Sequence, residues 1–371
     1  TGPEQRAVFR WITRREIVTG LPGWSSEQLP GPIVGFEALR RATTVAEVCA
    51  AVRDYRLPRE ALEAVDGKWL KEPDVWRTLL PIMPPGTLVR QLGRLTALGV
   101  LSGMASETTE VCQRLADGVA LKRARVHPLA CLLAAGAYAT GRTGSTRANA
   151  LTWSPVRRII DALTEGFYAA FPVVEPTGKR LVLAVDCSGS MGSQCLADSR
   201  LTAREAAGAL SLVIAATEPR HEIVGFTHGL RGEWVPTGSY AGNRGPHRGY
   251  EAAISRLAIS PRQRLDDVVR TMAAVPMGGT DCALPMLWAL EQKVEADAFI
   301  LLTDSETWAG TIHPSQALQM YRERMGIAAK LVVVAMTATE CSIVAPHDAG
   351  RLDFVGFDAA GPGLMADFVR G

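Results

Sequence analysis

Four short apolar runs alternate with helical patterns in the second half of the chain, and this alternation constrains the fold more than any other feature. The runs are rich in β-branched and aliphatic residues, which predicts buried strands at residues 180–186, 221–227, 298–304 and 330–337. Apolar residues three and four apart predict helices at residues 201–217, 265–275, 283–292 and 314–326. Strands that alternate with helices favour a parallel, doubly wound α/β sheet. Between residues 227 and 262 we expect no regular element, because a Gly-rich, basic stretch there is typical of a loop.

The first half has only the helical pattern. Apolar residues recur at helical spacing in seven segments, at residues 6–18, 36–55, 74–83, 86–101, 109–119, 127–141 and 156–171. Pro and Gly separate these segments, which predicts a helical bundle or an α-solenoid. The pattern changes just after residue 172. We therefore expect an all-α domain over residues 1–172 and an α/β domain over residues 173–371.

Composition and charge exclude some functions and leave others open. Residues 1–178 carry 22 Lys and Arg against 17 Asp and Glu, whereas residues 179–371 carry 18 against 21. The basic half is compatible with an anionic partner. The seven cysteines form no CxxC pair, which suits reduced thiols and a cytoplasmic protein. No apolar run approaches the roughly 20 residues that span a membrane, so we expect no membrane partner.

A cluster of oxygen-bearing residues follows the first predicted strand. Asp186, Ser188 and Ser190 alternate along the sequence DCSGS, and Gly189 and Gly192 are expected to permit the turn. Ligands of open α/β sheets bind at the carboxyl ends of the strands. Two further loops at that edge offer Thr280 and Asp304. Hard oxygen ligands suit a divalent ion, and Mg²⁺ best.

Two other interpretations of these residues stay open. An Asp that follows a strand is often only the N-cap of the next helix. The paired carboxylates Asp186 and Asp304 could also support metal-assisted hydrolysis. However, no His lies near them in sequence as a base, and the sequence lacks functional HExxH, GxGxxG, P-loop and GxSxG sets. We therefore expect no enzyme and no catalytic residues.

The three loops together resemble the von Willebrand factor A family. Its metal-ion-dependent adhesion site, or MIDAS, uses a DxSxS motif, a Thr and an Asp, which match Asp186, Ser188, Ser190, Thr280 and Asp304. The resemblance implies that a carboxylate from a partner often completes the metal shell. Asp281 and Glu306 flank the site and are expected to support it or to cap helices.

Longer blocks resemble the Ro autoantigen family, whose helical module is called TROVE. The similar blocks are VWRTLLPIMPPGTLVRQLGRLT, RVHPLACLLAAGAYATGR, TDCALPMLWAL, TDSETWAG and AGRLDFVGFDAAGP. The resemblance implies a ring of HEAT-like helical repeats closed by an A domain. It also implies binding of the ends of misfolded non-coding RNA in a basic hole, binding of Y RNA on the outside, and an exoribonuclease partner in bacterial relatives.

The resemblance begins part of the way along the family's helical module. Members carry a longer segment before the point that matches this chain, so the first helices of the ring are expected to be absent here. A homo-oligomer could then close the ring.

Seven residues of the helical half are candidates for contact with RNA. Arg90 and Arg94 are four apart and share a helix face. The densest basic cluster holds Lys122, Arg123, Arg125 and His127, and Arg142 lies in a Gly-rich loop. The alternative for each is an ordinary solvated surface charge.

Two functions follow from these features. The first is a non-catalytic, Ro-type ribonucleoprotein that binds small structured or misfolded RNA through its basic helical domain and contacts partners through a metal-loaded A domain. The second is a metal-dependent protein-adhesion scaffold that does not bind RNA.

Overall fold

The computed structural model describes residues 29–143, 150–196, 199–228, 234, 252–275, 280–304, 312–337 and 348–371. By its internal contacts the chain divides into two compact units. One consists of residues 1–114 and 151–159, and the other of residues 115–150 and 160–371. These units do not divide the chain at residue 172, and the predicted domain boundary stays a prediction.

The first unit consists of short helices. They are α2 (Gly31–Arg41), α3 (Val45–Tyr55), α4 (Arg59–Asp66), η2 (Gly67–Lys71), α5 (Pro73–Leu79), η3 (Leu80–Ile82), α6 (Pro85–Ala97) and most of α7 (Ser106–Ala116). The single helix predicted over residues 36–55 is wrong, because α2 ends at Arg41 and Thr44 starts α3 as its N-cap. The Thr44 side chain accepts from the Glu47 amide, and the Glu47 carboxylate accepts from the Thr44 amide, which completes a capping box.

Tryptophans form part of the core of this unit. Trp76 is fully buried and its indole nitrogen donates to the Leu70 carbonyl over 2.9 Å. The ring of Trp153 covers Gly93, where an added Cβ would lie 2.7 Å from the ring. A side chain at position 93 would therefore displace the ring from α6.

The second unit is built on a sheet of six strands. The strands are β1 (Leu181–Asp186), β2 (His221–His228), β3 (Ala252–Arg256), β4 (Ala298–Thr303), β5 (Lys330–Ala335) and β6 (Arg351–Val355), in the order β3-β2-β1-β4-β5-β6. All neighbouring pairs are parallel except β2 with β3. The expectation of a helical region followed by a doubly wound α/β domain is confirmed. The expectation of a purely parallel sheet with no element between residues 227 and 262 is wrong, because β3 adds an antiparallel edge there.

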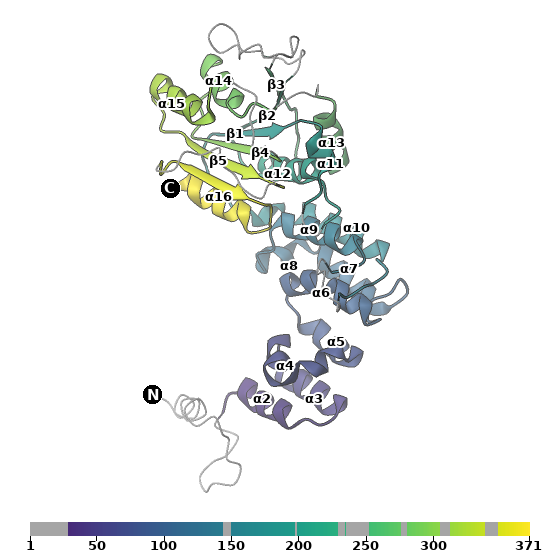
Figure 1. Ribbon diagram of the computed structural model, residues 1–371. Coiled ribbons are helices and arrows are strands. Elements are labelled where there is room, and N and C mark those ends of the chain that lie inside the picture. The colour runs from purple at the N-terminus through teal and green to yellow at the C-terminus, as the bar shows by residue number, and fades with distance from the viewer. Residues whose placement is uncertain are drawn as a thin grey trace. The chain divides into compact units, whose positions relative to one another are not determined.

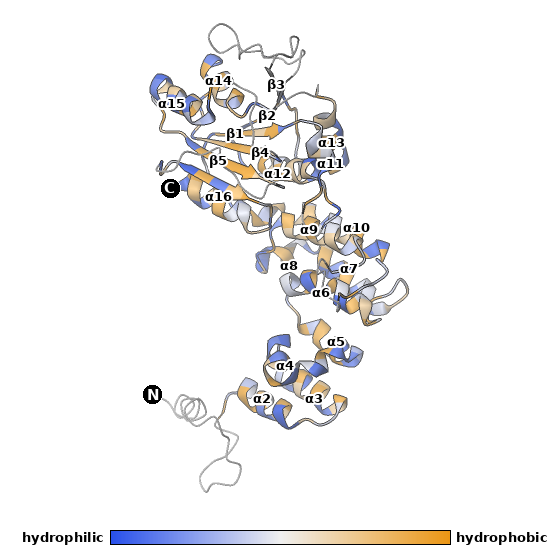
Figure 2. Ribbon diagram, in the orientation of Figure 1, coloured by the Kyte–Doolittle hydropathy of each residue, from blue (hydrophilic) through white to orange (hydrophobic). Residues whose placement is uncertain are grey.

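Helices cover both faces of this sheet (Figure 1). On one face α14 (Leu284–Glu291) and α15 (Pro314–Met325) bury Phe299, Leu301 and the alternate residues of the neighbouring strands. On the other, α12 (Ala203–Thr217) and α16 (Gly361–Arg370) approach Leu181 and Ile300. The central strands are apolar along their length (Figure 2) because both of their faces are buried.

The remaining helices of this unit precede or flank the sheet. They are α8 (Gly118–Arg123), α9 (Pro128–Ala139), most of α10 (Arg157–Ala169), η4 (Phe171–Val173), α11 (Ser190–Ser193) and α13 (Leu265–Ala273). No helix of the described residues is long and apolar enough to cross a bilayer.

Candidate metal centre and basic surfaces

Asp186 is the last residue of β1, and the loop that follows it folds back on its carboxylate. The residue is fully buried between β2 and β4. The Ser188 amide donates to Asp186 Oδ1 over 2.8 Å, and the hydroxyls of Ser188 and Ser190 lie 3.1 Å apart. Three oxygen-bearing side chains of one short loop therefore converge at the carboxyl end of β1.

Two threonines from other segments contact the second oxygen of Asp186. The Thr280 hydroxyl, just before α14, donates to Asp186 Oδ2 over 3.1 Å. The Thr303 hydroxyl, at the end of β4, donates to the same oxygen over 2.8 Å. The sequence analysis missed Thr303. Its position directly before Asp304, at the end of a predicted strand, was the available signal.

Asp304 is buried, and neither of its carboxylate oxygens has a hydrogen-bond partner among the described residues. Burial raises the pKa of Asp186, and the nearby charge of Asp304 raises it further. Two buried carboxylates thus lie close together, and one of them has no partner to offset the loss of water. A cation between them would supply that partner.

The chemistry of this set fits a hard divalent ion. The described residues hold no cluster of three His, Cys, Asp or Glu, so the candidate ligands are two carboxylates and hydroxyls. Such a set suits Mg²⁺, which keeps several waters, better than Zn²⁺, which prefers His and Cys. The residues that could hold it are the predicted Asp186, Ser188, Ser190, Thr280 and Asp304.

Four residues flank the candidate metal ligands in sequence. Asp281 accepts from the Ala283 amide over 3.0 Å at the start of α14, and burial raises its pKa to about 6. Glu306 lies outside the described residues. Gly189 and Gly192 were expected to permit the turn; neither has a positive φ, and Gly189 is in an ordinary helical conformation, so the turn does not require left-handed backbone at either position.

The basic candidates fall into two groups, one in each compact unit. On α6, Arg90 is exposed, and Arg94 lies over the Trp76 ring at 6.0 Å from its centroid. In the other unit, Lys122 and Arg123 form the exposed last turn of α8, followed by the exposed Arg125. Each group presents a positive charge to solvent, and their role in RNA binding stays a prediction.

Two of the candidates have further backbone features. Arg125 has a φ of 53°, which is a left-handed conformation that favours glycine. Arg142 is exposed, and its carbonyl accepts from the Thr140 hydroxyl over 2.8 Å.

His127 has a structural position that the sequence did not suggest. Its Nδ1 accepts from the Leu129 amide over 3.2 Å and caps α9. Burial lowers the pKa of its ring to about 4, so the ring is neutral at physiological pH. His127 therefore contributes no positive charge to the basic group beside it.

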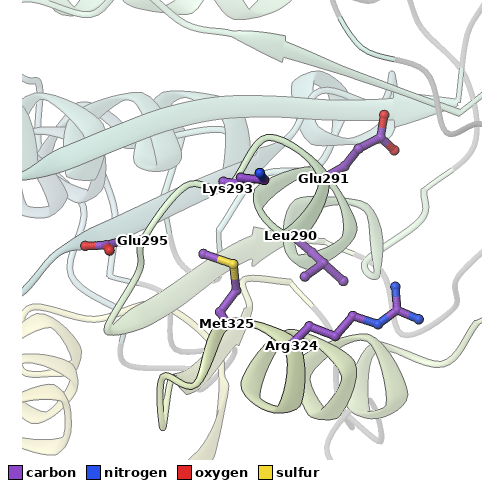
Figure 3. Close-up of a pocket in the computed structure, with 6 residues that line it drawn as sticks. All are labelled: Leu290, Glu291, Lys293, Glu295, Arg324 and Met325. Carbon is purple, nitrogen blue, oxygen red and sulfur yellow. The ribbon is translucent and has the colours of Figure 1, made fainter.

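A separate open hollow of about 570 Å³ lies where α14 and α15 end (Figure 3). It is lined by Leu290, Glu291, Lys293, Glu295, Arg324 and Met325. Acidic and basic side chains line it in equal number, so its charge favours neither anions nor cations.

The fold and the site define a class of protein, which is a helical module followed by a von Willebrand A-type α/β domain. A family model described as the Ro60 vWA domain matches residues 180–239 and 243–369, and one described as the TROVE domain matches residues 57–139. The chain belongs to the Ro family, which combines these two modules.

Relatives support the same assignment. The chain is 39% identical over 341 residues to the RNA-binding protein RO60 of Deinococcus radiodurans, a match that covers 91% of this chain and 58% of the relative. It is 37% identical to the RNA-binding protein RO60 of Caenorhabditis elegans, over 91% of this chain and 48% of the relative. The crystal structure of the Deinococcus radiodurans RO (RSR) protein matches with a TM-score of 0.78 and 38% identity, over 99% of this chain and 67% of that one. The chain thus spans about half to two thirds of these relatives.

Proposed function

We propose that this chain is a non-catalytic RNA-binding protein of the Ro type. The observation that carries the proposal is the similarity to two RNA-binding RO60 proteins, which extends over 91% of the chain and includes both modules. The ligand class is small structured or misfolded non-coding RNA, of the kind represented by Y RNA.

The exposed cations of the helical segments support this proposal physically. Lys122, Arg123 and Arg125 lie within four residues, and each of the three is exposed. Among the described residues none of the three has a carboxylate partner. Cations without counter-ions bind phosphates by releasing condensed counter-ions, which gives affinity without sequence specificity.

A salt series tests RNA binding. The probes are an RNA hairpin with a single-stranded 3′ end and the same hairpin with a blunt end, and binding is measured by gel shift and fluorescence anisotropy. We expect the affinity to fall steeply with salt, with a slope of about −0.7 for each phosphate neutralised on a single strand. Absence of binding to both probes at low salt would refute the proposal.

We also infer that the A domain holds a divalent metal ion, best Mg²⁺. Asp186 and Asp304 would supply charge, and Ser188, Ser190 and Thr280 would supply neutral oxygens. The bound ion would act as a Lewis acid toward an acidic group of a partner. Among the residues that the structure describes, the Asp304 carboxylate has no partner, which supports this inference because a buried charge needs compensation.

Calorimetric titration of EDTA-treated protein with Mn²⁺ and Mg²⁺ tests the metal. We expect one site in the wild type and none in Asp186→Ala. Asp367→Asn is a suitable control, because Asp367 is an exposed acid on α16 that pairs with Arg370. Equal heats for the wild type and Asp186→Ala would refute the inference.

The second candidate function is a metal-dependent adhesion scaffold that binds no RNA, and the same Asp304 carboxylate favours it. The two functions differ in what EDTA does. An adhesion scaffold loses its protein partner with EDTA and binds neither RNA probe at any salt concentration. An RNA-binding protein keeps its RNA when Asp186→Ala abolishes the metal. The exoribonuclease partner, the homo-oligomer and the cytoplasmic location stay predictions.

A further inference from the structure

The guanidinium of Arg204 packs against the predicted metal loop from outside the ligand set. Arg204 lies in the first turn of α12, and its Nη2 donates to the Ser188 carbonyl over 2.9 Å. The bond joins a second element of the fold to the middle residue of the DCSGS loop. The Arg204 guanidinium thereby holds the backbone of the loop at Ser188, whose hydroxyl lies 3.1 Å from the Ser190 hydroxyl.

The guanidinium of Arg204 also lies close to Gly192. A Cβ added at position 192 would lie 2.5 Å from Arg204 Nη1 and 3.0 Å from Arg204 Cζ. Since Gly192 has no positive φ, conformational freedom does not explain the glycine. The space that the guanidinium takes does explain it. The Arg204 guanidinium therefore contacts the chain at Ser188, before α11, and at Gly192, within it.

The positive charge of Arg204 is not balanced by an ion pair within the described part of the chain. The side chain has no carboxylate partner among the described residues, and its Nε is buried there without a hydrogen-bond acceptor. The adjacent Glu205 carboxylate is occupied, since it accepts from the amide and the hydroxyl of Thr202 at 2.7 and 2.9 Å. A cation that lacks a counter-ion and faces a predicted cation site weakens metal binding by charge alone. Any favourable effect of Arg204 on metal binding must therefore come from its contact with the loop.

We propose that Arg204 is the positioning residue of the metal loop, which holds Ser188 and Ser190 in the shape that presents their hydroxyls to the ion. The proposal rests on the inferred metal site. Groups that orient metal ligands from outside typically contribute ten- to hundredfold to metal affinity. For Arg204 this gain outweighs the repulsion between its charge and the ion.

The two effects of Arg204 have opposite signs, so one substitution separates them. Arg204→Ala removes the contact and the charge together. If positioning dominates, Mn²⁺ affinity measured by calorimetry falls about tenfold. If only the charge matters, the affinity rises. Arg200→Ala is the matched control, because it removes an exposed cation four residues away without touching the loop, and we expect unchanged or slightly higher affinity.

A double-mutant cycle tests the fit itself. Gly192→Ala pushes the guanidinium off Ser188 and is expected to lower Mn²⁺ affinity to a similar extent. In the Arg204→Ala background the same change should cost little more, because the clash is gone. Arg204→Lys keeps the charge but loses the planar fork, and should bind Mn²⁺ no more tightly than Arg204→Ala. Additive losses in the cycle, or full rescue by lysine, would overturn the proposal.

Two further readouts separate failure of this proposal from failure of the metal site. Without metal, hydrogen exchange of the amides of residues 187–193 should be faster in Arg204→Ala, while melting in EDTA stays close to the wild type. A wild type that binds no Mn²⁺ overturns the metal site and the role of Arg204 together. A wild type that binds Mn²⁺ as tightly as Arg204→Ala overturns the role of Arg204 alone.

Discussion

The substitution Asp304→Asn is expected to reverse the order of two melting curves. Without metal, Asp304 is a buried charge with both oxygens unpaired among the described residues. A buried unsatisfied group costs about 1–3 kcal/mol, and more when charged. The neutral, isosteric amide reduces this cost. In EDTA the variant should therefore melt at or slightly above the temperature of the wild type.

Mg²⁺ should raise the melting temperature of the wild type above that of Asp304→Asn. At a Mg²⁺ concentration about a hundredfold above the dissociation constant, ligand binding stabilises a protein by about 2.7 kcal/mol. For a unit of roughly 150–250 residues, each kcal/mol raises the melting temperature by about 2–4 °C. We thus expect the wild type to gain about 5–11 °C. Asp304→Asn should gain almost nothing, because it has lost a charged ligand.

Differential scanning fluorimetry of EDTA-treated protein, titrated with Mg²⁺, measures both curves. Asp367→Asn is the control and should follow the wild type. Parallel shifts of wild type and Asp304→Asn, or no shift of the wild type at any Mg²⁺ concentration, would show that Asp304 holds no metal.

The stability of the metal-free protein is expected to depend on pH through Asp186. The folded-state pKa of Asp186 is raised, chiefly by burial and also by Asp304. The folded protein then binds its proton more tightly than the unfolded chain does, so metal-free stability falls as pH rises from the ordinary Asp pKa through the raised one. Mg²⁺ should abolish this fall. Urea unfolding at several pH values, with and without Mg²⁺, measures it.

Three further predictions concern the basic segment before α9. The double substitution Lys122→Gln with Arg123→Gln should make the salt dependence of RNA binding shallower by about 1.4 in slope, read from anisotropy titrations. Arg125 and Lys293 both have a left-handed backbone, which glycine adopts without strain, so Arg125→Gly and Lys293→Gly should each raise the free energy of unfolding by about 1 kcal/mol. Only Arg125→Gly should also weaken RNA binding. Since burial lowers the pKa of His127 from 6.5 to about 4, the wild type should lose up to roughly 3 kcal/mol as pH falls through that window. His127→Asn, which can still cap the helix, should not show that loss in urea unfolding.

The strands that could be predicted from sequence are those buried on both faces. β1, β2, β4 and β5 are nearly continuous apolar runs, because neighbouring strands and helices surround them. The edge strands β3 and β6 are five residues long, and β6 is only partly buried. Their sequences lack that signal, since an edge strand keeps one side in contact with water. The sheet centre was therefore predictable and its edges were not.

The candidate site divides in a similar way. Asp186, Ser188 and Ser190 form a local motif, and strand order alone predicts that Thr280 and Asp304 meet them. The position of Thr303 directly before Asp304 was visible in the sequence, but its hydrogen bond to Asp186 depends on the parallel pairing of β4 with β1. The neutral state of His127 likewise depends on what covers its ring. The sequence alone does not predict the role of a side chain when that role depends on tertiary contacts.

The two ends of β4 offer the strongest structural support for the metal proposal. Asp297 precedes the strand, and its carboxylate is fully engaged by Arg180, whose amide, Nε and Nη2 donate at 2.8, 3.1 and 2.5 Å. These hydrogen bonds to Arg180 lower the pKa of Asp297. Asp304 follows the same strand, is more deeply buried, and has no such partner among the described residues. A fold that pairs its structural carboxylate at one end of a strand, yet leaves a deeper one unpaired beside Asp186 at the other, has the charge distribution of a site that binds a cation from solution.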